Sequence, residues 1–259
     1  VLNIFSLSTK KSRFRILKNW KYFHLLVVQF FLMKAITLTN KGYIKLTDNL
    51  LNSIKKNSID LEVTIGTMDK YSDGYYKKLG YRTNLLTNQN EKKFLRQDSD
   101  KFGKYMICKL DMIFSYLNKY EKVLYLDGDI VIKKNITQYL DLLLGEKDLL
   151  IQDDININKP EDENLCAGFM YINSNELTKS FFNTDNISEK ILMSGLHDQG
   201  YVNSNKSKLD FIKLDKELFP NGSYYYKNYE SIDPYIVHFN YILGKEKIKV
   251  IKKYGEWYT

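Results

Sequence analysis

The sequence predicts an α/β fold in which a mixed, mostly parallel β-sheet is flanked by helices. From residue 34 onward, segments rich in β-branched residues alternate with segments whose apolar residues recur with helical spacing. The segment 123–126 (VLYL) is almost continuously apolar, as expected for a central strand that helices cover on both faces. With 259 residues and 44% hydrophobic content, the chain is long enough to bury the core of one large domain.

The first half of the chain supplies the regular alternation. The predicted elements are a strand at 35–40, a helix at 42–56, a strand at 61–68, a short helix at 71–80, a polar loop at 88–100 and a helix at 103–120. The last helix is predicted from apolar residues that repeat about every 3.6 positions, and the strand at 61–68 from its β-branched residues. This order is typical of a parallel sheet with helices on both faces.

The second half begins regularly, but beyond residue 154 the order changes. The predicted elements are a helix at 136–145, a strand at 148–154, a polar loop at 155–165, a strand at 165–173, helices at 175–183, 187–195 and 197–208, a strand at 209–215, a loop at 218–228, a strand at 234–240 and a basic C-terminal tail. No internal repeat or low-complexity linker is present. We therefore expect one domain whose second half supplies loops over the first.

Two interpretations compete for the segment 123–132 (VLYLDGDIVI). Asp127-Gly128 between two apolar runs is a strong signal for a type I′ hairpin turn. Alternatively, Asp127 and Asp129 follow the end of a buried strand and hold a metal ion. The strand–helix alternation favours the second interpretation, because such sheets bind ligands at the carboxyl ends of their strands. Two carboxylates without a neighbouring cysteine or histidine suit Mg²⁺, Mn²⁺ or Ca²⁺, and Gly128 lets a bulky anion approach the backbone.

The charge and the cysteines narrow the classes of partner. An excess of 39 Lys and Arg over 31 Asp and Glu gives a net charge of +8, which favours anionic partners. Phosphate in a small ligand explains this charge as well as nucleic acid does, and without a nucleic-acid-binding signature we expect no nucleic-acid partner. Cys108 and Cys166 form no CxxC pair, which argues against a disulfide framework and a structural zinc site. We expect a cytoplasmic protein.

Residues 1–32 differ from the rest of the chain. A basic start followed by the apolar run Phe23–Met33 resembles a signal or anchor segment. The run is shorter than the ~20 residues that cross a bilayer, so no firm membrane span is predicted. We expect an N-terminal extension or leader at 1–32 and a single domain at 33–259. Membrane anchoring through the extension stays open, and an amphipathic first helix packed on the domain is an equal alternative.

Four motifs occur in an order that resembles a known family. They are an apolar strand ending in Asp-x-Asp (LYLDGD), the strand GFMYIN, the helix start HDQG and the late segment HFNYILGK. From about residue 34 to the C-terminus, the chain resembles the GT-A glycosyltransferases, whose sheet is Rossmann-like. More narrowly it is similar to retaining nucleotide-diphospho-sugar transferases of the family 77 kind, and more distantly to glycogenin-type enzymes. The resemblance implies transfer of a sugar, with retention, from a nucleotide diphosphate to a hydroxyl of a glycan, protein or lipid. The expected donor nucleotide is UDP.

The resemblance also implies roles for individual residues. Asp127, Asp129 and His238 would hold Mn²⁺ (or Mg²⁺), although a histidine hydrogen-bonded at a strand end is the alternative for His238. Asp198 and Gln199 would lie beside the donor sugar as the catalytic pair. Asp198 is also a suitable helix N-cap, and both roles are compatible.

A larger set of residues would contact the donor. The resemblance implies this role for Thr37, Thr39, Lys109, Gly128, Asp153, Asp154, Gly168, Gly244, Lys245 and Lys247. A solvated basic tail is the alternative for residues 245–253, and the sequence does not choose between Lys245 and Lys247. Asn221 and Gly222 fit a tight turn. One departure is Cys166, which stands where the family often has an amide, and this puts the identity or positioning of the sugar in doubt.

Other interpretations of the chain remain open at this point. A haloacid-dehalogenase-type phosphatase would use Asp127 as a nucleophile and Asp129 as an acid, but three strand–helix units precede its expected first strand. An inactive relative that uses the GT-A fold for binding is the non-enzymatic alternative. Tyr224, Tyr225 and Tyr226 could line an acceptor groove by stacking on sugar rings, or they could be ordinary core and rim residues.

Overall fold

A computed structural model describes residues 32–86, 100–156, 158–159, 163–187 and 197–258, except for the side chains of 100–106 and 245. The expected leader at 1–32 lies almost wholly outside these residues, as do most of the polar loop at 88–100 and of the helix expected at 187–195. The described residues from Met33 onward belong to one compact unit. The expectations for the N-terminal part stay predictions.

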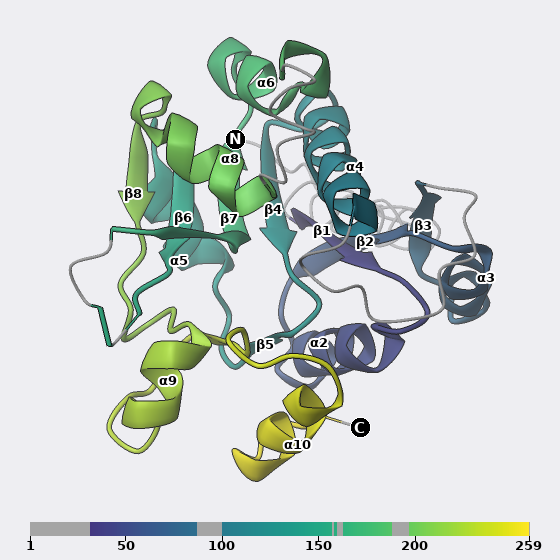
Figure 1. The fold of residues 1–259 in the computed structure, drawn as a ribbon, viewed down its shortest axis with the longest axis vertical. Helices are drawn as coiled ribbons and strands as arrows, with labels where there is room; N and C mark the ends of the chain where they lie inside the picture. Colours follow the sequence, from purple (N-terminus) through teal and green to yellow (C-terminus); the bar gives the residue numbers. More distant parts are fainter. Residues whose placement is uncertain (1–31, 87–99, 157, 160–162, 188–196, 259) are drawn as a thin grey trace, which may run out of the picture. The chain divides into compact units, whose positions relative to one another are not determined.

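A mixed sheet forms the centre of the described part (Figure 1). Its strands are β1 Met33–Thr39, β2 Leu61–Thr67, β3 Arg82–Leu85, β4 Lys122–Leu126, β6 Leu149–Asp153, β7 Leu165–Asn173 and β8 Phe211–Lys213. Their order is β3-β2-β1-β4-β7-β6-β8. The pairs β3·β2, β2·β1, β1·β4 and β6·β8 are parallel, whereas β7 runs antiparallel to both β4 and β6. The predicted mixed, mostly parallel sheet is confirmed; only β3 was missed, because its four residues are mostly polar and too few for a pattern.

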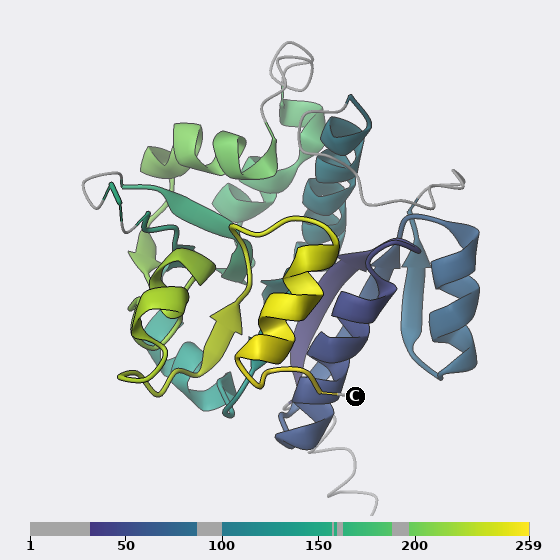
Figure 2. The same ribbon diagram turned by 60° about the horizontal axis from the view of Figure 1, so that its bottom comes forward.

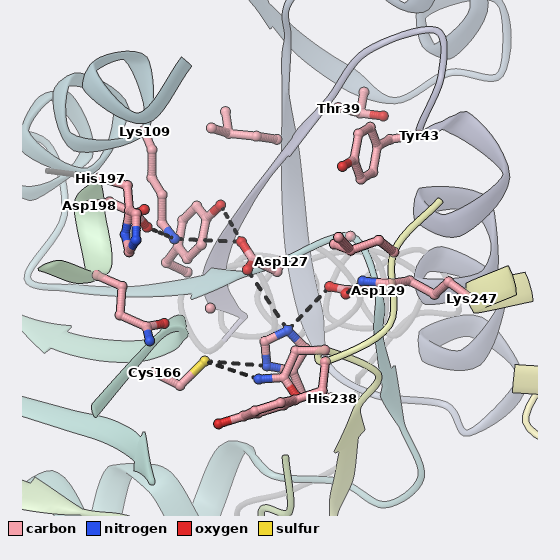
Figure 3. A pocket seen from close by; sticks show the side chains of 18 of the residues that line it. Thr39, Tyr43, Lys109, Asp127, Asp129, Cys166, His197, Asp198, His238 and Lys247 are labelled. Atoms are coloured by element: carbon pink, nitrogen blue, oxygen red, sulfur yellow. Dashed lines mark hydrogen bonds and ion pairs between the residues drawn. The ribbon is translucent and has the colours of Figure 1, made fainter. Parts of the chain in front are cut away.

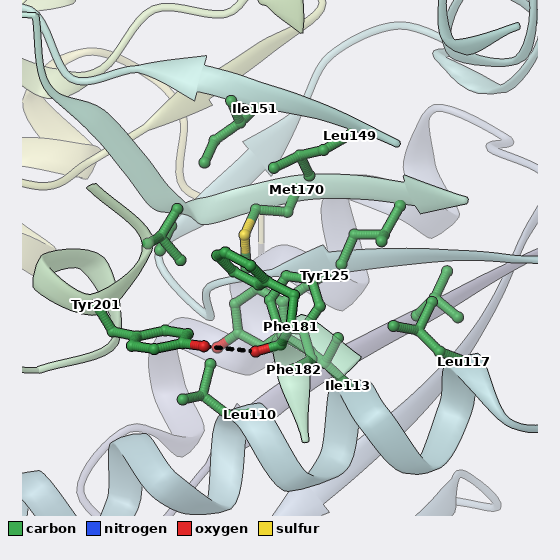
Figure 4. Close-up of a cluster of buried hydrophobic side chains, with 14 of the residues drawn as sticks. Leu110, Ile113, Leu117, Tyr125, Leu149, Ile151, Met170, Phe181, Phe182 and Tyr201 are labelled. Atoms are coloured by element: carbon green, nitrogen blue, oxygen red, sulfur yellow. Dashed lines mark hydrogen bonds between the residues drawn. The ribbon is translucent and has the colours of Figure 1, made fainter. Parts of the chain in front are cut away.

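Helices cover both faces of this sheet. The helices are α2 Ile44–Lys56, α3 Lys70–Lys78, α4 Asp100–Leu117, α5 Thr137–Leu144, α6 Glu176–Phe182, α8 Asp198–Asn205, α9 Gly222–Asn228 and α10 Lys245–Lys253. Helices α4, α6 and α8 pack on one face (Figure 4), and α2 and α5 pack on the other. Successive residues of β4 point to opposite faces, so Val123 and Tyr125 contact the first group and Leu124 and Leu126 the second. This two-sided burial explains why the segment is continuously apolar.

The hairpin interpretation of 123–132 is wrong. The Ile130 N–H donates to the Asp127 carbonyl at 3.2 Å, so the chain does turn here. However, β5 (Ile130–Ile132) leaves the main sheet and pairs antiparallel with β9 (Ile236–His238), not with β4. The two aspartates therefore lie where one strand of the main sheet ends and a second, small sheet begins.

Two C-terminal segments form helices that were not predicted. The predicted loop at 218–228 contains α9, and the Asn221 side chain caps this helix by accepting a hydrogen bond from the Tyr224 N–H at 2.9 Å. Asn221 thus starts a helix instead of forming a tight turn. The predicted basic tail contains α10, which lies beside α2 (Figure 2) and shares a core cluster with it through Ile251 and Leu46. Within the described ranges, no helix is long and apolar enough to cross a membrane.

Candidate active site

A cavity of about 600 Å³ lies at the edge of the sheet where β1 and β4 end (Figure 3). Because β7 runs antiparallel to β4, the start of β7 reaches the same edge and brings Cys166 and Gly168 to the cavity. Asp154, directly after β6, also lines it. Most of the polar side chains that line the cavity thus lie at the carboxyl ends of the parallel strands, where an α/β sheet ordinarily binds its ligand.

Asp127, Asp129 and His238 converge on one side of this cavity. One donor atom from each lies within 4.8 Å of the others. His238 Nε2 is 3.2 Å from Asp129 Oδ1 and 3.8 Å from Asp127 Oδ2. The β5·β9 pairing sets this geometry, because it places His238 opposite Ile130, the residue after Asp129. Two carboxylates and an imidazole form a donor set that fits Mn²⁺ or Mg²⁺.

Gln152 fixes the orientation of the His238 ring. Gln152 Nε2 donates to the Phe219 carbonyl at 3.0 Å, which turns Oε1 toward His238 Nδ1 at 2.8 Å. Oε1 then accepts the Nδ1 proton, which leaves Nε2 facing the two aspartates. Cys166 Sγ lies 3.5 Å from the same Nδ1. The sequence did not reveal Gln152, because no motif marks a residue that acts through another side chain.

The charges of this group are strongly coupled. Burial alone lowers the pKa of His238, but the adjacent Asp129 carboxylate and Cys166 together outweigh it and raise that pKa well above its usual value. Burial likewise raises the pKa of Asp129, but Lys247 and His238 outweigh it and hold that pKa well below its usual range. Asp129 therefore stays ionised, and a divalent ion held by Nε2 would have to displace a proton from His238.

Lys109 links Asp198 to Asp127. It is 2% exposed and donates to Asp198 Oδ2 at 2.6 Å and to the Ala167 carbonyl at 2.7 Å. Its ammonium also lies 3.5 Å from Asp127 Oδ1 and 4.1 Å from the centre of the Tyr125 ring. Burial lowers the pKa of Lys109, but Asp127 and Asp198 outweigh it and raise that pKa, so Lys109 is a buried cation.

The N-cap of α8 is one residue earlier than expected. His197 is the N-cap, and its Nδ1 accepts from the Gly200 N–H at 3.4 Å, so the N-cap role considered for Asp198 is wrong. Asp198 instead occupies the first turn of the helix and faces Lys109. Gln199 Nε2 donates to Asp154 Oδ2 at 2.8 Å. Asp198, Gln199 and Asp154 all line the cavity.

The C-terminal helix brings Lys247 into the cavity. Its ammonium donates to Asp129 Oδ2, and the residue is 8% exposed. The described side chains thus place Lys247 at the site, whereas the Lys245 side chain lies outside what the structure describes. Gly244 has φ of 63°, a backbone conformation that favours glycine, and it precedes α10 without lining the cavity.

Of the remaining residues predicted to contact the sugar donor, some line the cavity and others do not. Thr39 lines the cavity, whereas the Thr37 hydroxyl is buried without a hydrogen-bonding partner among the described residues. Asp153 forms an ion pair of 3.3 Å with Lys213 and does not line the cavity. Gly168 is required by space, because a Cβ there would lie 2.4 Å from His238 Cε1 and 2.6 Å from Asp127 Oδ2.

The three tyrosines of α9 do not line the cavity. Tyr225 is buried in a core cluster with Phe239, and the Tyr226 hydroxyl donates to the Asn240 carbonyl at 2.9 Å. Tyr224 lies 3.5 Å from Glu217 through its hydroxyl. An acceptor role for them stays a prediction.

Several cavity residues were not predicted from the sequence. They are Leu38, Asn40, Tyr43, Met68, Tyr125, His197, Asn240, Tyr241, Ile242 and Leu243. Asn40 and Met68 directly follow the ends of β1 and β2, so the rule that ligands bind at strand ends could have found them. Burial, Asp129 and Asp127 raise the pKa of Tyr43 to about 12, so it presents a neutral phenol to the cavity.

This combination of a mixed α/β sheet, an acidic pair after a central strand and a facing histidine defines a GT-A glycosyltransferase. Residues 59–251 match the family described as nucleotide-diphospho-sugar transferase. The chain belongs to this family of glycosyltransferases. The phosphatase interpretation does not fit this membership, and it is abandoned.

Known relatives agree with this assignment. The chain is 28% identical to the UDP-galactose:fucoside alpha-3-galactosyltransferase of Dictyostelium discoideum, over 87% of this chain and 43% of the relative. It thus spans less than half of that protein. The apo glycosyltransferase GlyE of Streptococcus pneumoniae TIGR4 has a TM-score of 0.55 at 17% identity, covering 86% of this chain and 59% of GlyE. Galactosyltransferase LgtC, in complex with donor and acceptor sugar analogues, has a TM-score of 0.55 at 13% identity, covering 88% and 97%. At these identities the two structures show a shared fold.

Proposed function

We propose that the domain at 33–259 transfers a sugar from a UDP-sugar to an acceptor hydroxyl, with a divalent metal ion and with retention at the anomeric carbon. The convergence of Asp127, Asp129 and His238 beside a cavity of about 600 Å³ carries this proposal. Mn²⁺ or Mg²⁺ suits the three donor atoms. When bound, such an ion neutralises charge that develops on the departing diphosphate.

Different residues of this chain would contact the diphosphate and the sugar of the donor. Lys247, at the metal side, would place its ammonium near the diphosphate and stabilise the leaving group. Asp198 and Gln199 lie on the other side of the cavity, where Lys109 and Asp154 hold them in place. The Asp198 carboxylate would stabilise the positive charge that develops on the sugar ring. Thr39, the last residue of β1, and Tyr43, shortly after it, would contact the nucleoside.

UDP as donor is supported by the name of the Dictyostelium relative, which transfers from UDP-galactose. Because Cys166 stands where the family often has an amide, the contacts to the sugar would differ here. Asn240 Nδ2 lies 3.2 Å from Asp154 Oδ1 and 3.8 Å from Cys166 Sγ. The acceptor would be a hydroxyl of a glycoconjugate. Retention rests on the resemblance to retaining transferases.

A donor screen tests this proposal. Nucleotide release from UDP-, GDP- and CMP-sugars is followed with Mn²⁺, with Mg²⁺ and after treatment with EDTA. We expect UDP release that EDTA abolishes and Mn²⁺ restores. The variants Asp127→Asn and Asp129→Asn should lose it, whereas Asp60→Asn, at an exposed site, should not. Metal-independent release, or full release by both site variants, would contradict the proposed metal site. NMR of the product's anomeric configuration tests retention, and binding of UDP-sugar without turnover would instead support the binding-module alternative.

A further inference from the structure

Asp129 is a largely buried carboxylate that forms an ion pair with a lysine from a distant part of the chain. The side chain of Asp129 is 10% exposed, and that of Lys247 is 11% exposed. One oxygen, Oδ2, accepts from Lys247, while the other, Oδ1, faces His238 Nε2 at 3.2 Å. A carboxylate this buried requires a balancing positive charge. Among the described residues, Lys247 provides much of that charge, and its partner Asp129 is a proposed metal ligand.

The other lysine of the site is held differently. Lys109 is fixed by Asp198 at 2.6 Å, by the Ala167 carbonyl at 2.7 Å and by the face of the Tyr125 ring. The described contacts of the Lys247 ammonium are with Asp129 alone. Lys247 also lines the cavity, in the first turn of α10 after Gly244. Lys247 can therefore exchange its partner within the cavity, whereas Lys109 cannot without uncovering a buried charge.

We propose that Lys247 is an internal counter-ion of Asp129 that a divalent cation must displace, and that the donor diphosphate then receives its ammonium. This inference rests on the proposed function for the metal site and for the diphosphate. Without nucleotide, Lys247 competes with the metal ion for Asp129 and weakens metal binding. With the diphosphate present, the released ammonium gains a new anionic partner and Lys247 favours the complex. One side chain thus couples metal binding to donor binding, and the coupling acts equally on both ligands.

The test measures binding, so it does not depend on turnover. Mn²⁺ affinity of the metal-free full chain is measured by electron paramagnetic resonance of free Mn²⁺. Lys247→Gln removes the competing charge, and we expect it to bind Mn²⁺ about tenfold more tightly, a change of ~1.4 kcal/mol. Lys247→Met, which keeps the aliphatic stem, should show a similar gain. Lys247→Arg keeps the charge and should bind Mn²⁺ as the wild type does.

A matched control and a second ligand complete the test. Lys249→Gln removes an exposed lysine of the same helix, which pairs with Glu246, and should leave Mn²⁺ affinity unchanged. Calorimetric titration with UDP in saturating Mn²⁺ should show weaker binding by Lys247→Gln, the opposite sign to its effect on Mn²⁺ alone. A merely structural defect would weaken both ligands.

The outcomes separate this inference from the proposed function. If the wild type binds Mn²⁺ but neither neutral variant binds it more tightly, the counter-ion role is overturned while the metal site stands. If the wild type binds no Mn²⁺, and the Asp127→Asn variant shows the same lack of Mn²⁺ binding, the metal site itself is refuted. Tighter Mn²⁺ binding with unchanged UDP binding would also overturn the inference, because the diphosphate would not receive the ammonium.

Discussion

Lys109 Nζ lies 2.6 Å from Asp198 Oδ2, and both side chains are almost fully buried. The pair joins α4 to the first turn of α8 and fixes the proposed catalytic carboxylate relative to Asp127. Buried ion pairs are strongly destabilising when one partner is removed, because the other remains as an uncompensated charge.

The first prediction concerns this pair. Lys109→Met should destabilise the fold by about 3–5 kcal/mol, because Asp198 loses its cation. Asp198→Asn should destabilise it less, because Lys109 retains the Ala167 carbonyl and Asp127. Urea unfolding of both single variants and of the double variant gives the coupling energy. Strictly additive effects would show that the pair makes no net interaction.

The second prediction concerns Gln152, which orients His238. Gln152→Leu removes the acceptor for the Nδ1 proton, and we expect Mn²⁺ affinity to fall by roughly 10–100-fold. Gln152→Glu keeps an acceptor oxygen and should lose less. Calorimetry with Mn²⁺ on the nucleotide-free protein measures both. Equal affinities for the wild type and the leucine variant would mean that Gln152 has no part in orienting the ring.

The third prediction uses the space around Gly168. Gly168→Ala would put its Cβ within 2.4 Å of His238 Cε1, so the ring must move and the proposed metal ligands separate. We expect Mn²⁺-dependent UDP release to fall below about a tenth of the wild-type rate, as misplacement by about 1 Å predicts. The control is Gly74→Ala in α3, where the Cβ meets no atom within 4 Å. Normal release by Gly168→Ala would show that the site tolerates the displacement.

The fourth prediction concerns pH and the stability of the fold. Burial raises the pKa of Asp73, but hydrogen bonds from Lys77, Thr83 and Thr67 outweigh it and lower that pKa. Because the pKa is lower in the folded chain than the value of 3.8 in the unfolded chain, the ionised carboxylate stabilises the fold at pH values above 3.8. This stabilisation is lost as the pH falls through the pKa of the folded chain. Asp73→Asn should therefore destabilise the protein by about 1–2 kcal/mol at pH 7. Urea unfolding should show this difference shrinking below about pH 4.

A control separates this effect from general acid sensitivity. Asp60→Asn changes an exposed carboxyl and should leave both the stability and its pH dependence nearly unchanged. A loss for Asp73→Asn that is the same at pH 7 and pH 3 would attribute the effect to packing and not to charge.

The sequence predicted those features of the fold that depend on residues close together in the chain. The helical spacing of α4 and α2 and the apolar run 123–126 are local patterns, and both gave elements close to the observed ones. The position of Asp127 at a strand end followed from the same pattern, because the order of strands and helices predicts which edge of the sheet binds a ligand. Short elements such as β3 and α9 were missed, because a few residues carry too little periodicity.

The sequence by itself determined the α/β architecture and the acidic pair after β4, since periodicity and apolar runs are properties of adjacent residues. Only the tertiary structure decided that β5 pairs with β9, which brings His238 to Asp129. It likewise decided that Gln152 orients that histidine and that Lys247 reaches Asp129 from 118 positions away. These contacts join residues far apart in the chain. They depend on which surfaces pack together, and no local pattern records that choice.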